Sequence, residues 1–395
     1  MSRSFTSLAF RLSLLYAALL AVIGIQQPFW PVWLAGKGLN AAEIGLLLAL
    51  SIGVKVISAP LVAHLADRSG ERKWLMIIFA AVAIGSFATF LATEQFWPIL
   101  IVSLVYFAVW PPVVTLAESV TMQAAKARRL EYGRVRLWGS LSFIVAAAIA
   151  GQALTVQPPS VIYWMIIAVQ LIVFICCCLI PDRRETANVS RRLPVWAALC
   201  HRPFACFLIA SGLIQASHAV YYAFATLAWK AAGHSEAVIG LLWAEGVLAE
   251  IVLFVFGLRL IARFGPRRLL ALAGAAAAVR WLGTGLSDAL PALIVLQTLH
   301  ALSFGAAHLA AMHYISEEIA ADLSATAQSL YSGVVWGLFL GGGLLTAGLL
   351  FERMHTAAFL PMVIPALAGC IVAIWPTRSS TTVATQMHAV SETQS

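Results

Sequence analysis

The sequence has few charged residues. Only 11% of its 395 residues are Asp, Glu, Lys or Arg, whereas 61% are hydrophobic and the mean hydropathy is +0.90. A soluble globular domain carries about 25% charged residues. This shortage excludes an ordinary water-soluble fold and predicts an all-α chain that crosses a lipid bilayer many times.

Several motifs of defined chemistry are also missing. The sequence holds no G-x-x-x-x-G-K-[ST] phosphate loop and no H-E-x-x-H metal motif. Its six cysteines lack zinc-ligand spacing, and Cys176, Cys177 and Cys178 are consecutive in an apolar run, where they act as small hydrophobic residues. We therefore expect that the protein is not an enzyme and binds no cofactor or metal. Any energy-requiring step is then expected to be driven by an ion gradient and not by a nucleotide.

Long apolar runs fill most of the chain. A membrane helix needs about 20 apolar residues. The first run follows a basic start and continues to Leu34 without a small-residue cleavage site, so we expect it to be a retained span. The sequence predicts twelve spans, over residues 8–35, 41–63, 74–92, 97–122, 133–153, 160–181, 204–230, 237–261, 268–287, 290–316, 325–350 and 356–376.

Basic residues are distributed unevenly between the loops. If the N-terminus is cytoplasmic, 20 of the 25 Lys and Arg residues lie on the inner side and 3 on the outer side. This bias predicts a multi-pass protein of a bacterial inner (plasma) membrane with both termini in the cytoplasm. It also explains the net charge of +8 without nucleic acid as a partner.

The chain shows signs of an internal duplication. A charged loop, Pro181–Pro194, divides the spans into six and six, and a basic glycine turn follows the second span of each half, as ADRSGERK with Gly70 and ARFGPRR with Gly265. We expect an N-terminal six-helix half over 1–181, a cytoplasmic loop over 182–203 and a C-terminal half over 204–378. The Ser/Thr-rich tail over 379–395 is expected to be disordered.

This organisation resembles the major facilitator superfamily. The loop HLADRSGERK matches the superfamily's cytoplasmic gate motif at Asp67, Arg68, Gly70, Arg72 and Lys73, with His64 at a position where the pattern has Gly. The resemblance implies twelve transmembrane helices in two six-helix halves, transport by alternating access, and a monomer. It also implies that the Asp at the helix end pairs with a nearby basic residue.

Charged residues within the spans point to a functional site. Glu118 and Arg136 lie at similar depth on the antiparallel fourth and fifth spans, so they can form an ion pair. Arg134 is about 200° from Arg136 around the helix, and we assign it to the lipid headgroups. Two arginines that both anchor the helix at the headgroups remain an alternative.

The same stretch is similar to the fifth span of lactose permease-type sugar:proton symporters. In that family the second Arg of G-R-x-R pairs with a Glu and binds substrate, which implies this role for Arg136 and Glu118. Glu245, Arg280 and His300 match the family's buried carboxylate, arginine and histidine. The family's proton-carrying Glu and a neighbouring Lys are Ser303 and Gln297 here, and its two buried aspartates are Ala219 and Tyr222.

A closer resemblance is to the phenylpropionate permease family, through QASHAVYYAF, GLLWAEGVLAE, VRWLG and HLAAMHYI. It implies a small aromatic monocarboxylate, such as 3-phenylpropionate, imported with a proton. A positive group must then bind the carboxylate, and the candidates are Lys55, Arg136 and Arg280. Aromatic side chains would form a flat apolar slot for the ring of the cargo. The alternative is that they belong to the aromatic belt at the membrane interface. The candidates for the slot are Phe29, Trp30, Trp33, Tyr221, Tyr222, Trp243 and Trp281.

Proton coupling needs a group that changes its protonation state near neutral pH. The candidates are Glu245, His300 and His308, with Glu118 and His218 as further possibilities. Glu250 lies about 140° from Glu245 around the helix, so we expect it to have a different partner or a structural role.

Three alternatives stay open at this level. The first is a sugar or nucleoside:proton symporter of the same fold, favoured by Glu118 and Arg136. The second is a membrane-embedded enzyme, and the third is a transporter-like sensor that binds a ligand without moving it. The small-molecule cargo and protons are the expected partners in the favoured interpretation.

Overall fold

The computed structural model describes residues 3–128, 130–182, 202–319 and 324–376, and these residues form helices without any strand. The tail over 379–395 lies outside this part of the chain, as does the expected central loop apart from residues 182, 202 and 203.

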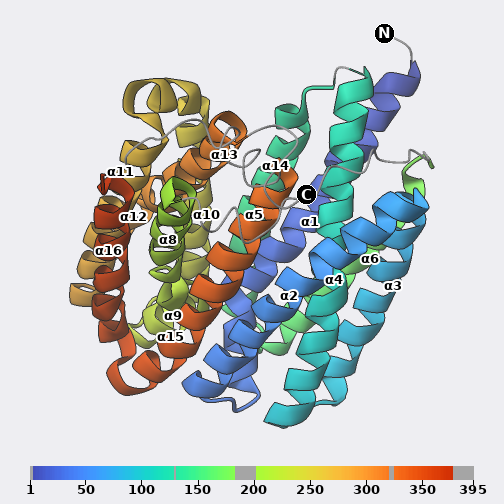
Figure 1. The fold of residues 1–395 in the computed structure, drawn as a ribbon. Helices are drawn as coiled ribbons and strands as arrows, with labels where there is room; N and C mark the ends of the chain where they lie inside the picture. Colours follow the sequence, from blue (N-terminus) through green and yellow to red (C-terminus); the bar gives the residue numbers. More distant parts are fainter. Residues whose placement is uncertain (1–2, 129, 183–201, 320–323, 377–395) are drawn as a thin grey trace, which may run out of the picture. The chain divides into compact units, whose positions relative to one another are not determined.

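The first half of the chain contains six long helices close to the predicted spans (Figure 1). They are α1 (Arg3–Gly36), α2 (Ala41–Ser69), α3 (Arg72–Ala88, followed by the short helix Thr89–Ala92), α4 (Phe96–Arg128), α5 (Tyr132–Leu154) and α6 (Ser160–Leu179).

The second half is more interrupted. Its helices are α8 (Arg202–Ala216), α9 (Ala219–Ala231), α10 (Glu236–Val255), α11 (Gly257–Leu286), α12 (Leu290–Thr298), α13 (Ala307–Glu318), α14 (Ser324–Tyr331), α15 (Gly341–Met354) and α16 (Val363–Ile374). Wider π-helical stretches, Ala301–Ala306 and Ser332–Leu340, join α12 to α13 and α14 to α15. A short 3₁₀ helix, His355–Met362, joins α15 to α16.

Eleven stretches of the described chain are long and apolar enough to cross a membrane. The last of them, Thr326–Ile374, is 49 residues long and covers two predicted spans. It is interrupted at His355, which has a positive φ of 51° and a ψ of −127°. Two crossings in this stretch give the twelve predicted spans.

Several predicted span ends differ from the helix ends, and α2 and α4 each continue six residues past the predicted ends at 63 and 122. The sequence placed the end of the eighth span at residue 261, but α10 ends at Val255 and the backbone leaves the helical region at Phe256. A second interruption follows at Gly265, where φ is 70°. The sequence predicted one glycine turn at ARFGPRR after the eighth span. The structure has instead an eight-residue helical segment, Gly257–Phe264, between breaks at Phe256 and Gly265.

The chain forms two compact units. The first comprises Met1–Ala187 together with Tyr222–Leu248, and the second comprises Asn188–Tyr221 together with Ala249–Ser395. The unit boundaries therefore fall inside α9 and α10, so that parts of these helices belong to different units.

In the first unit α1 packs along α5 and α6, while α3 lies beside α4 and α6 (Figure 1). Gly24 permits the close approach of α1 and α5. A Cβ atom at this position would lie 2.7 Å from the carbonyl oxygen of Phe143 and 2.9 Å from its Cα atom. Contacts of this kind between backbones are how membrane helices gain packing energy, since lipid offers no hydrophobic driving force between them.

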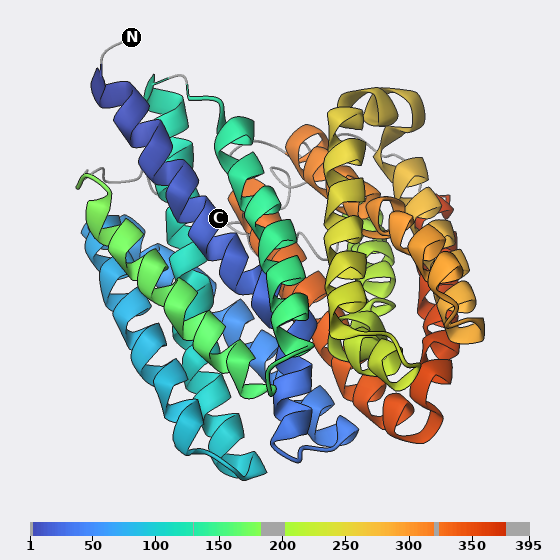
Figure 2. The ribbon, with the colours of Figure 1, turned by 180° about the vertical axis from the view of Figure 1, so that it is seen from behind.

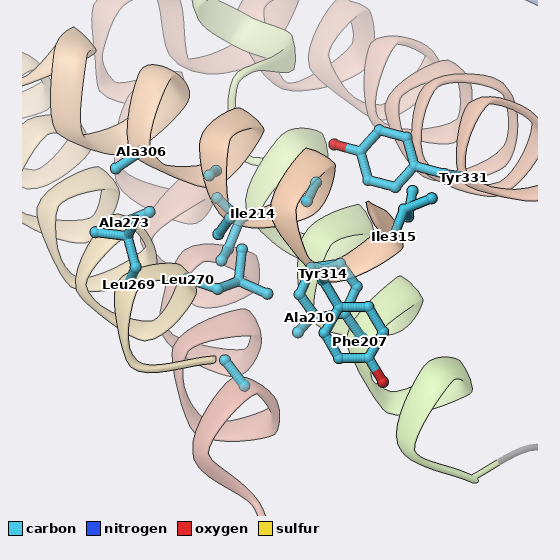
Figure 3. Packing of buried hydrophobic residues seen from close by; sticks show 14 of the residues in the cluster. Phe207, Ala210, Ile214, Leu269, Leu270, Ala273, Ala306, Tyr314, Ile315 and Tyr331 are labelled. Atoms are coloured by element: carbon cyan, nitrogen blue, oxygen red, sulfur yellow. The ribbon is translucent and has the colours of Figure 1, made fainter. Parts of the chain in front are cut away.

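The second unit is built around α8 and α11, each of which packs against α16. Its core is shown in Figure 3, where the rings of Phe207 and Tyr314 lie against each other with centroids 4.1 Å apart and an interplanar angle of 8°. Leu269 and Leu270 of α11 are fully buried in the same cluster. This packed layer supports the polar residues described next.

Candidate functional site

A buried arginine organises the polar interior of the second unit. Arg280 of α11 is only 1% exposed. Its guanidinium donates hydrogen bonds to the Nδ1 atom of His300 at 2.8 Å, to the Oγ atom of Ser303 at 3.4 Å, and to the Oε1 atom of Gln297. A charged group inside a membrane protein is costly unless its donors are satisfied, and here three side chains accept from it.

The arginine also determines the protonation of His300. Because a guanidinium can only donate, the Nδ1 atom of His300 must accept, and the proton of the neutral ring then lies on Nε2. That Nε2 atom is 2.7 Å from Oε1 of Glu250, so His300 donates to the carboxylate. Glu250, His300 and Arg280 thus form a chain in which a neutral imidazole joins a negative and a positive group.

Aromatic rings and a second histidine enclose this chain. The guanidinium carbon of Arg280 lies 4.2 Å from the ring centroid of Tyr221 and 4.6 Å from that of Trp281, which is cation–π geometry. His218 is fully buried at the break between α8 and α9. Its Nδ1 atom lies 2.9 Å from the carbonyl oxygen of Ile214, and its Nε2 atom 3.3 Å from Oγ of Ser303.

The structure brings together only part of the residues proposed for proton coupling. Of these three, His300 is in direct contact with Arg280, which was proposed for substrate binding. Glu245 is half-buried on the part of α10 that belongs to the first unit. His308 lies two turns after His300 and stacks on Phe304 with ring centroids 6.2 Å apart.

Glu250 is the residue that sequence reasoning missed. It was expected to have a different partner from that of Glu245 or a structural role, and the structure gives His300 as its partner. The resemblance to the lactose permease-type family favoured Glu245, which matches that family's buried carboxylate. The available signal was only that Glu250 is a second carboxylate in an apolar helix.

The first unit holds a lysine in an unusual setting. Lys55 lies at the middle of α2 and is exposed, and no other described side chain forms an ion pair or hydrogen bond with its ammonium group. At 100° per residue it points within about 40° of the buried Ser51 and Val62, and at least about 120° from the exposed Leu50 and Leu61. Lys55 therefore lies on the side of α2 that carries buried residues, but its own side chain is not covered by neighbouring side chains.

The predicted pair of Glu118 and Arg136 is present. Nη1 of Arg136 lies 3.7 Å from Oε1 of Glu118, and both side chains are about half exposed. Tyr132 joins them, because its hydroxyl accepts from Nη1 of Arg136 at 3.2 Å and donates to Oε1 of Glu118 at 3.3 Å. Arg134 points elsewhere and pairs with Glu131. Tyr132 was not predicted, although its position one turn before Arg136 was a usable signal.

Most of the aromatic residues proposed for a slot are buried in the packing between helices. Phe29, Trp30 and Trp33 are at most 4% exposed, and the rings of Trp30 and Trp33 stack with centroids 4.5 Å apart. Trp243 is also buried, with its Nε1 atom donating to Oγ1 of Thr226 at 2.9 Å. Tyr222 is only half-buried.

The gate motif forms a compact turn. Gly70 caps α2 with a φ of 70°, a conformation that favours glycine. Arg72 is buried and its Nη2 atom lies 2.6 Å from Oδ1 of Asp67, so the predicted pairing of this Asp with a basic residue is confirmed. Arg68 is exposed and Lys73 is half-buried.

The two units hold different groups that are able to bind a ligand or a proton. No group of three His, Cys, Asp or Glu side chains gathers at metal-binding distance among the described residues. The first unit contributes Lys55, which has no partner among the described residues, and a carboxylate–arginine pair, and the second contributes a buried carboxylate–histidine–arginine chain.

Comparison with known proteins identifies the class of molecule. The model of the MFS_1 like family matches residues 9–360. The chain is 32% identical over 349 residues to a protein named probable 3-phenylpropionic acid transporter from Escherichia coli K12, covering 87% of this chain and 91% of that relative. It is 27% identical to the maltose permease of Geobacillus stearothermophilus, covering 91% and 92% of the two chains.

Solved structures show the same fold. The crystal structure of a point mutant of the nucleoside transporter NupG superposes with a TM-score of 0.81, covering 97% of this chain and 99% of that one at 14% identity. The predicted all-α membrane fold of two six-helix halves is therefore confirmed, and these relatives are transporters and not enzymes. This chain is a multi-pass membrane transporter that belongs to the MFS_1 like family of the major facilitator superfamily.

Proposed function

We propose that this protein is a proton-coupled symporter that imports a small aromatic monocarboxylate, such as 3-phenylpropionate, by alternating access. The observation that carries the proposal is Lys55, a cation at the middle of a membrane helix that no described acidic group neutralises. The 32% identical relative, which is named as a probable 3-phenylpropionic acid transporter, supports the same class of cargo.

The carboxylate of the cargo is proposed to bind Lys55. A lysine within the membrane normally pairs with an acid or faces a water-filled cavity, and a site for an anion needs a positive group with free donors. Of the three candidate cations, Arg136 is held by Glu118 and Tyr132, and the donors of Arg280 are engaged by three side chains. The buried hydroxyl of Ser51, one turn before Lys55, has no hydrogen-bond partner among the described residues and is a second donor on the same side.

The proton is proposed to bind Glu250 rather than His300. Protonating Nδ1 of His300 would remove its hydrogen bond from Arg280 and place two cations side by side. Protonating Glu250 removes the negative end of the chain and weakens its contact with His300. A proton on Glu250 and a carboxylate on Lys55 together add no net charge, which favours movement of both through a medium of low dielectric constant.

The other candidate residues are proposed to have the roles that the sequence indicated. Glu118, Arg136, Tyr222 and Arg280 are proposed to contribute to the substrate site, and Glu245 and His308 to proton coupling. Asp67, Arg68, Gly70, Arg72 and Lys73 are proposed to form a cytoplasmic gate. The protein is proposed to act as a monomer in a bacterial inner membrane with both termini in the cytoplasm.

A second candidate is a sugar or nucleoside:proton symporter. The group formed by Glu118, Tyr132 and Arg136 offers hydrogen-bond donors and acceptors that are half exposed, which suits the hydroxyls of a sugar. Relatives named as maltose and lactose permeases support this interpretation.

Uptake into proteoliposomes tests the proposal. Radiolabelled 3-phenylpropionate, lactose and a nucleoside would each be supplied under an imposed inward proton gradient, with and without an uncoupler. We expect the gradient to drive accumulation of the aromatic acid, and the uncoupler to abolish it. Accumulation of lactose or the nucleoside instead would identify the second candidate as correct.

Variants of Lys55 give the matched comparison. Lys55→Gln is expected to reduce uptake of the acid by on the order of tenfold or more, because the loss of a direct charge-assisted contact is typically worth about 1.5–3 kcal/mol. Lys55→Arg keeps the charge and is expected to retain part of the activity. Lys37→Gln removes a lysine of the loop that follows α1 and should leave uptake unchanged. Normal uptake by Lys55→Gln would reject Lys55 as the carboxylate site.

A further inference from the structure

The segment between α10 and the long part of α11 lies between two interruptions of the helix and has no role in the proposed transport site. Phe256 interrupts the helix on one side with φ −97° and ψ 4°, and Gly265 interrupts it on the other with φ 70° and ψ 166°. The eight residues Gly257–Phe264 between them form a short helix of independent direction, and Figure 2 shows the first turns of α11 turning aside from the direction of α10.

This short helix has two different sides. Gly257 and Ile261 are buried, and Gly257 faces the side chain of Leu309 on α13. The opposite side exposes Arg259 and Arg263, one helical turn apart, beside Leu258, which is 87% exposed. The side that faces away from the unit therefore combines strong positive charge with a fully projecting apolar residue.

This side of the helix is unfavourable both in bulk water and in the hydrocarbon region of the bilayer. An exposed leucine is unfavourable in water, and two arginines are unfavourable in hydrocarbon. A basic amphipathic helix that carries both kinds of residue fits the boundary between headgroups and acyl chains. Because most arginines of this chain lie on the predicted cytoplasmic side, that boundary belongs to the cytoplasmic leaflet, whose surface is negative.

The arginines are positioned for an anionic partner. The guanidinium of Arg259 lies 6.0 Å from the ring centroid of Phe256, and that of Arg263 lies 5.7 Å from the ring centroid of Phe264. Stacking uses one face of a guanidinium and leaves its N–H donors at the edge available for phosphate. Among the described acidic side chains, none pairs with Arg259, Arg263 or Arg268.

We propose that Gly257–Phe264, with Arg259 and Arg263, forms a binding surface for anionic phospholipid headgroups such as phosphatidylglycerol. The phosphate contacts the two guanidinium groups, and Leu258 inserts among the first carbons of the acyl chains. The proposal is independent of the cargo, because it depends only on a membrane-embedded chain.

Native mass spectrometry of the full chain in detergent tests the proposal. The protein would be titrated with phosphatidylglycerol or with phosphatidylcholine of the same acyl chains. We expect phosphatidylglycerol to bind more tightly, and the Arg259→Gln/Arg263→Gln double variant to bind it on the order of tenfold more weakly, with phosphatidylcholine binding unchanged. Soluble glycerol phosphate should compete poorly, because it lacks acyl chains for Leu258 to contact.

Two further variants separate this site from general effects. Lys37→Gln/Arg353→Gln removes the same charge from positions outside the segment and should leave phosphatidylglycerol binding intact. Arg259→Lys/Arg263→Lys keeps the charge and should retain most of the binding, which also shows that the altered segment still folds. The proposal is overturned if the double Gln variant binds phosphatidylglycerol like the wild type, if the control variant loses as much affinity, or if the wild type does not distinguish the two lipids.

Discussion

At the scale of single residues, the hydrogen bond between Arg280 and His300 has the most specific consequence. It requires Nδ1 of His300 to accept, which leaves Nε2 to donate to Glu250 and makes the carboxylate the end of the chain that can take up a proton. Ser303 occupies the position at which the lactose permease-type family carries an acid, and its hydroxyl lies within hydrogen-bond distance of both Arg280 and His218. The proton acceptor is thus proposed to lie on α10 instead of on the helix of His300.

Replacing Glu250 by Gln tests this placement. The amide cannot take up a proton at physiological pH, so gradient-driven accumulation of the cargo is expected to fall more than tenfold. Exchange of labelled for unlabelled cargo without a gradient is expected to persist, because it needs no net proton movement. Both are measured in the proteoliposomes described above.

Glu245→Gln is the comparison within the same helix, and we expect it to reduce coupling less than Glu250→Gln does, because Glu245 lies outside the chain of Glu250, His300 and Arg280. Loss of coupling in Glu245→Gln together with normal coupling in Glu250→Gln would show that the resemblance, and not the observed contact, identifies the proton acceptor.

At the scale of elements, glycines control how closely two helices approach. Gly24→Ala places a Cβ atom against the backbone of Phe143 on α5, and backbone atoms cannot move aside as a flexible side chain can. We expect a loss of about 1–3 kcal/mol in stability, visible as a lower melting temperature of the purified protein in detergent. Gly53→Ala is the control, because a Cβ atom there meets nothing within 4 Å. Equal melting temperatures for the two variants would contradict this account of the α1–α5 contact.

The turn between α2 and α3 depends on a different feature of glycine. Gly70 has a φ of 70°, and any other residue except Asn or Asp adopts this conformation at a cost of about 1 kcal/mol. Gly70→Ala is therefore expected to destabilise the turn by about that amount, while Gly70→Asn should be tolerated better. Thermal unfolding in detergent measures both, and an Ala variant as stable as the wild type would argue against the strain.

The ion pair of the same turn can be tested separately. Arg72 is buried, so Asp67→Asn removes a counter-charge from a guanidinium inside the protein, which is more damaging than the loss of an exposed pair. We expect Asp67→Asn to lower the melting temperature more than Glu131→Gln, whose partner Arg134 is 82% exposed. The reverse order would show that the Asp67–Arg72 pair adds little to stability.

At the scale of the whole molecule, charge distribution predicts the orientation in the membrane. With both termini in the cytoplasm, alkaline phosphatase fused after residue 378 should be inactive, because it folds only outside the cytoplasm, and a fluorescent protein fused there should fluoresce. An alkaline phosphatase fusion after Lys37 should be active, since that loop is expected outside. Activity in the opposite pattern would reverse the predicted orientation.

The sequence alone determined the properties that depend on composition and period. Apolar runs of sufficient length gave the helices and most of their ends, because a bilayer demands that every span satisfy its own backbone hydrogen bonds. Depth matching along two antiparallel spans predicted the contact of Glu118 and Arg136, since neighbours in sequence are usually neighbours in space. The glycine turn and its Asp67–Arg72 pair also followed from local spacing.

Only the tertiary structure decided which polar side chains meet when they come from helices far apart in the chain. The choice of Glu250 over Glu245 depends on helix rotation, on the break at Phe256 and on the wider π-helical turns after His300. The lack of a described partner for Lys55 likewise depends on the rotation of α2. A shift of one or two residues in rotation changes the face that a side chain occupies, and a hydrophobic pattern that is apolar on all sides does not define this rotation.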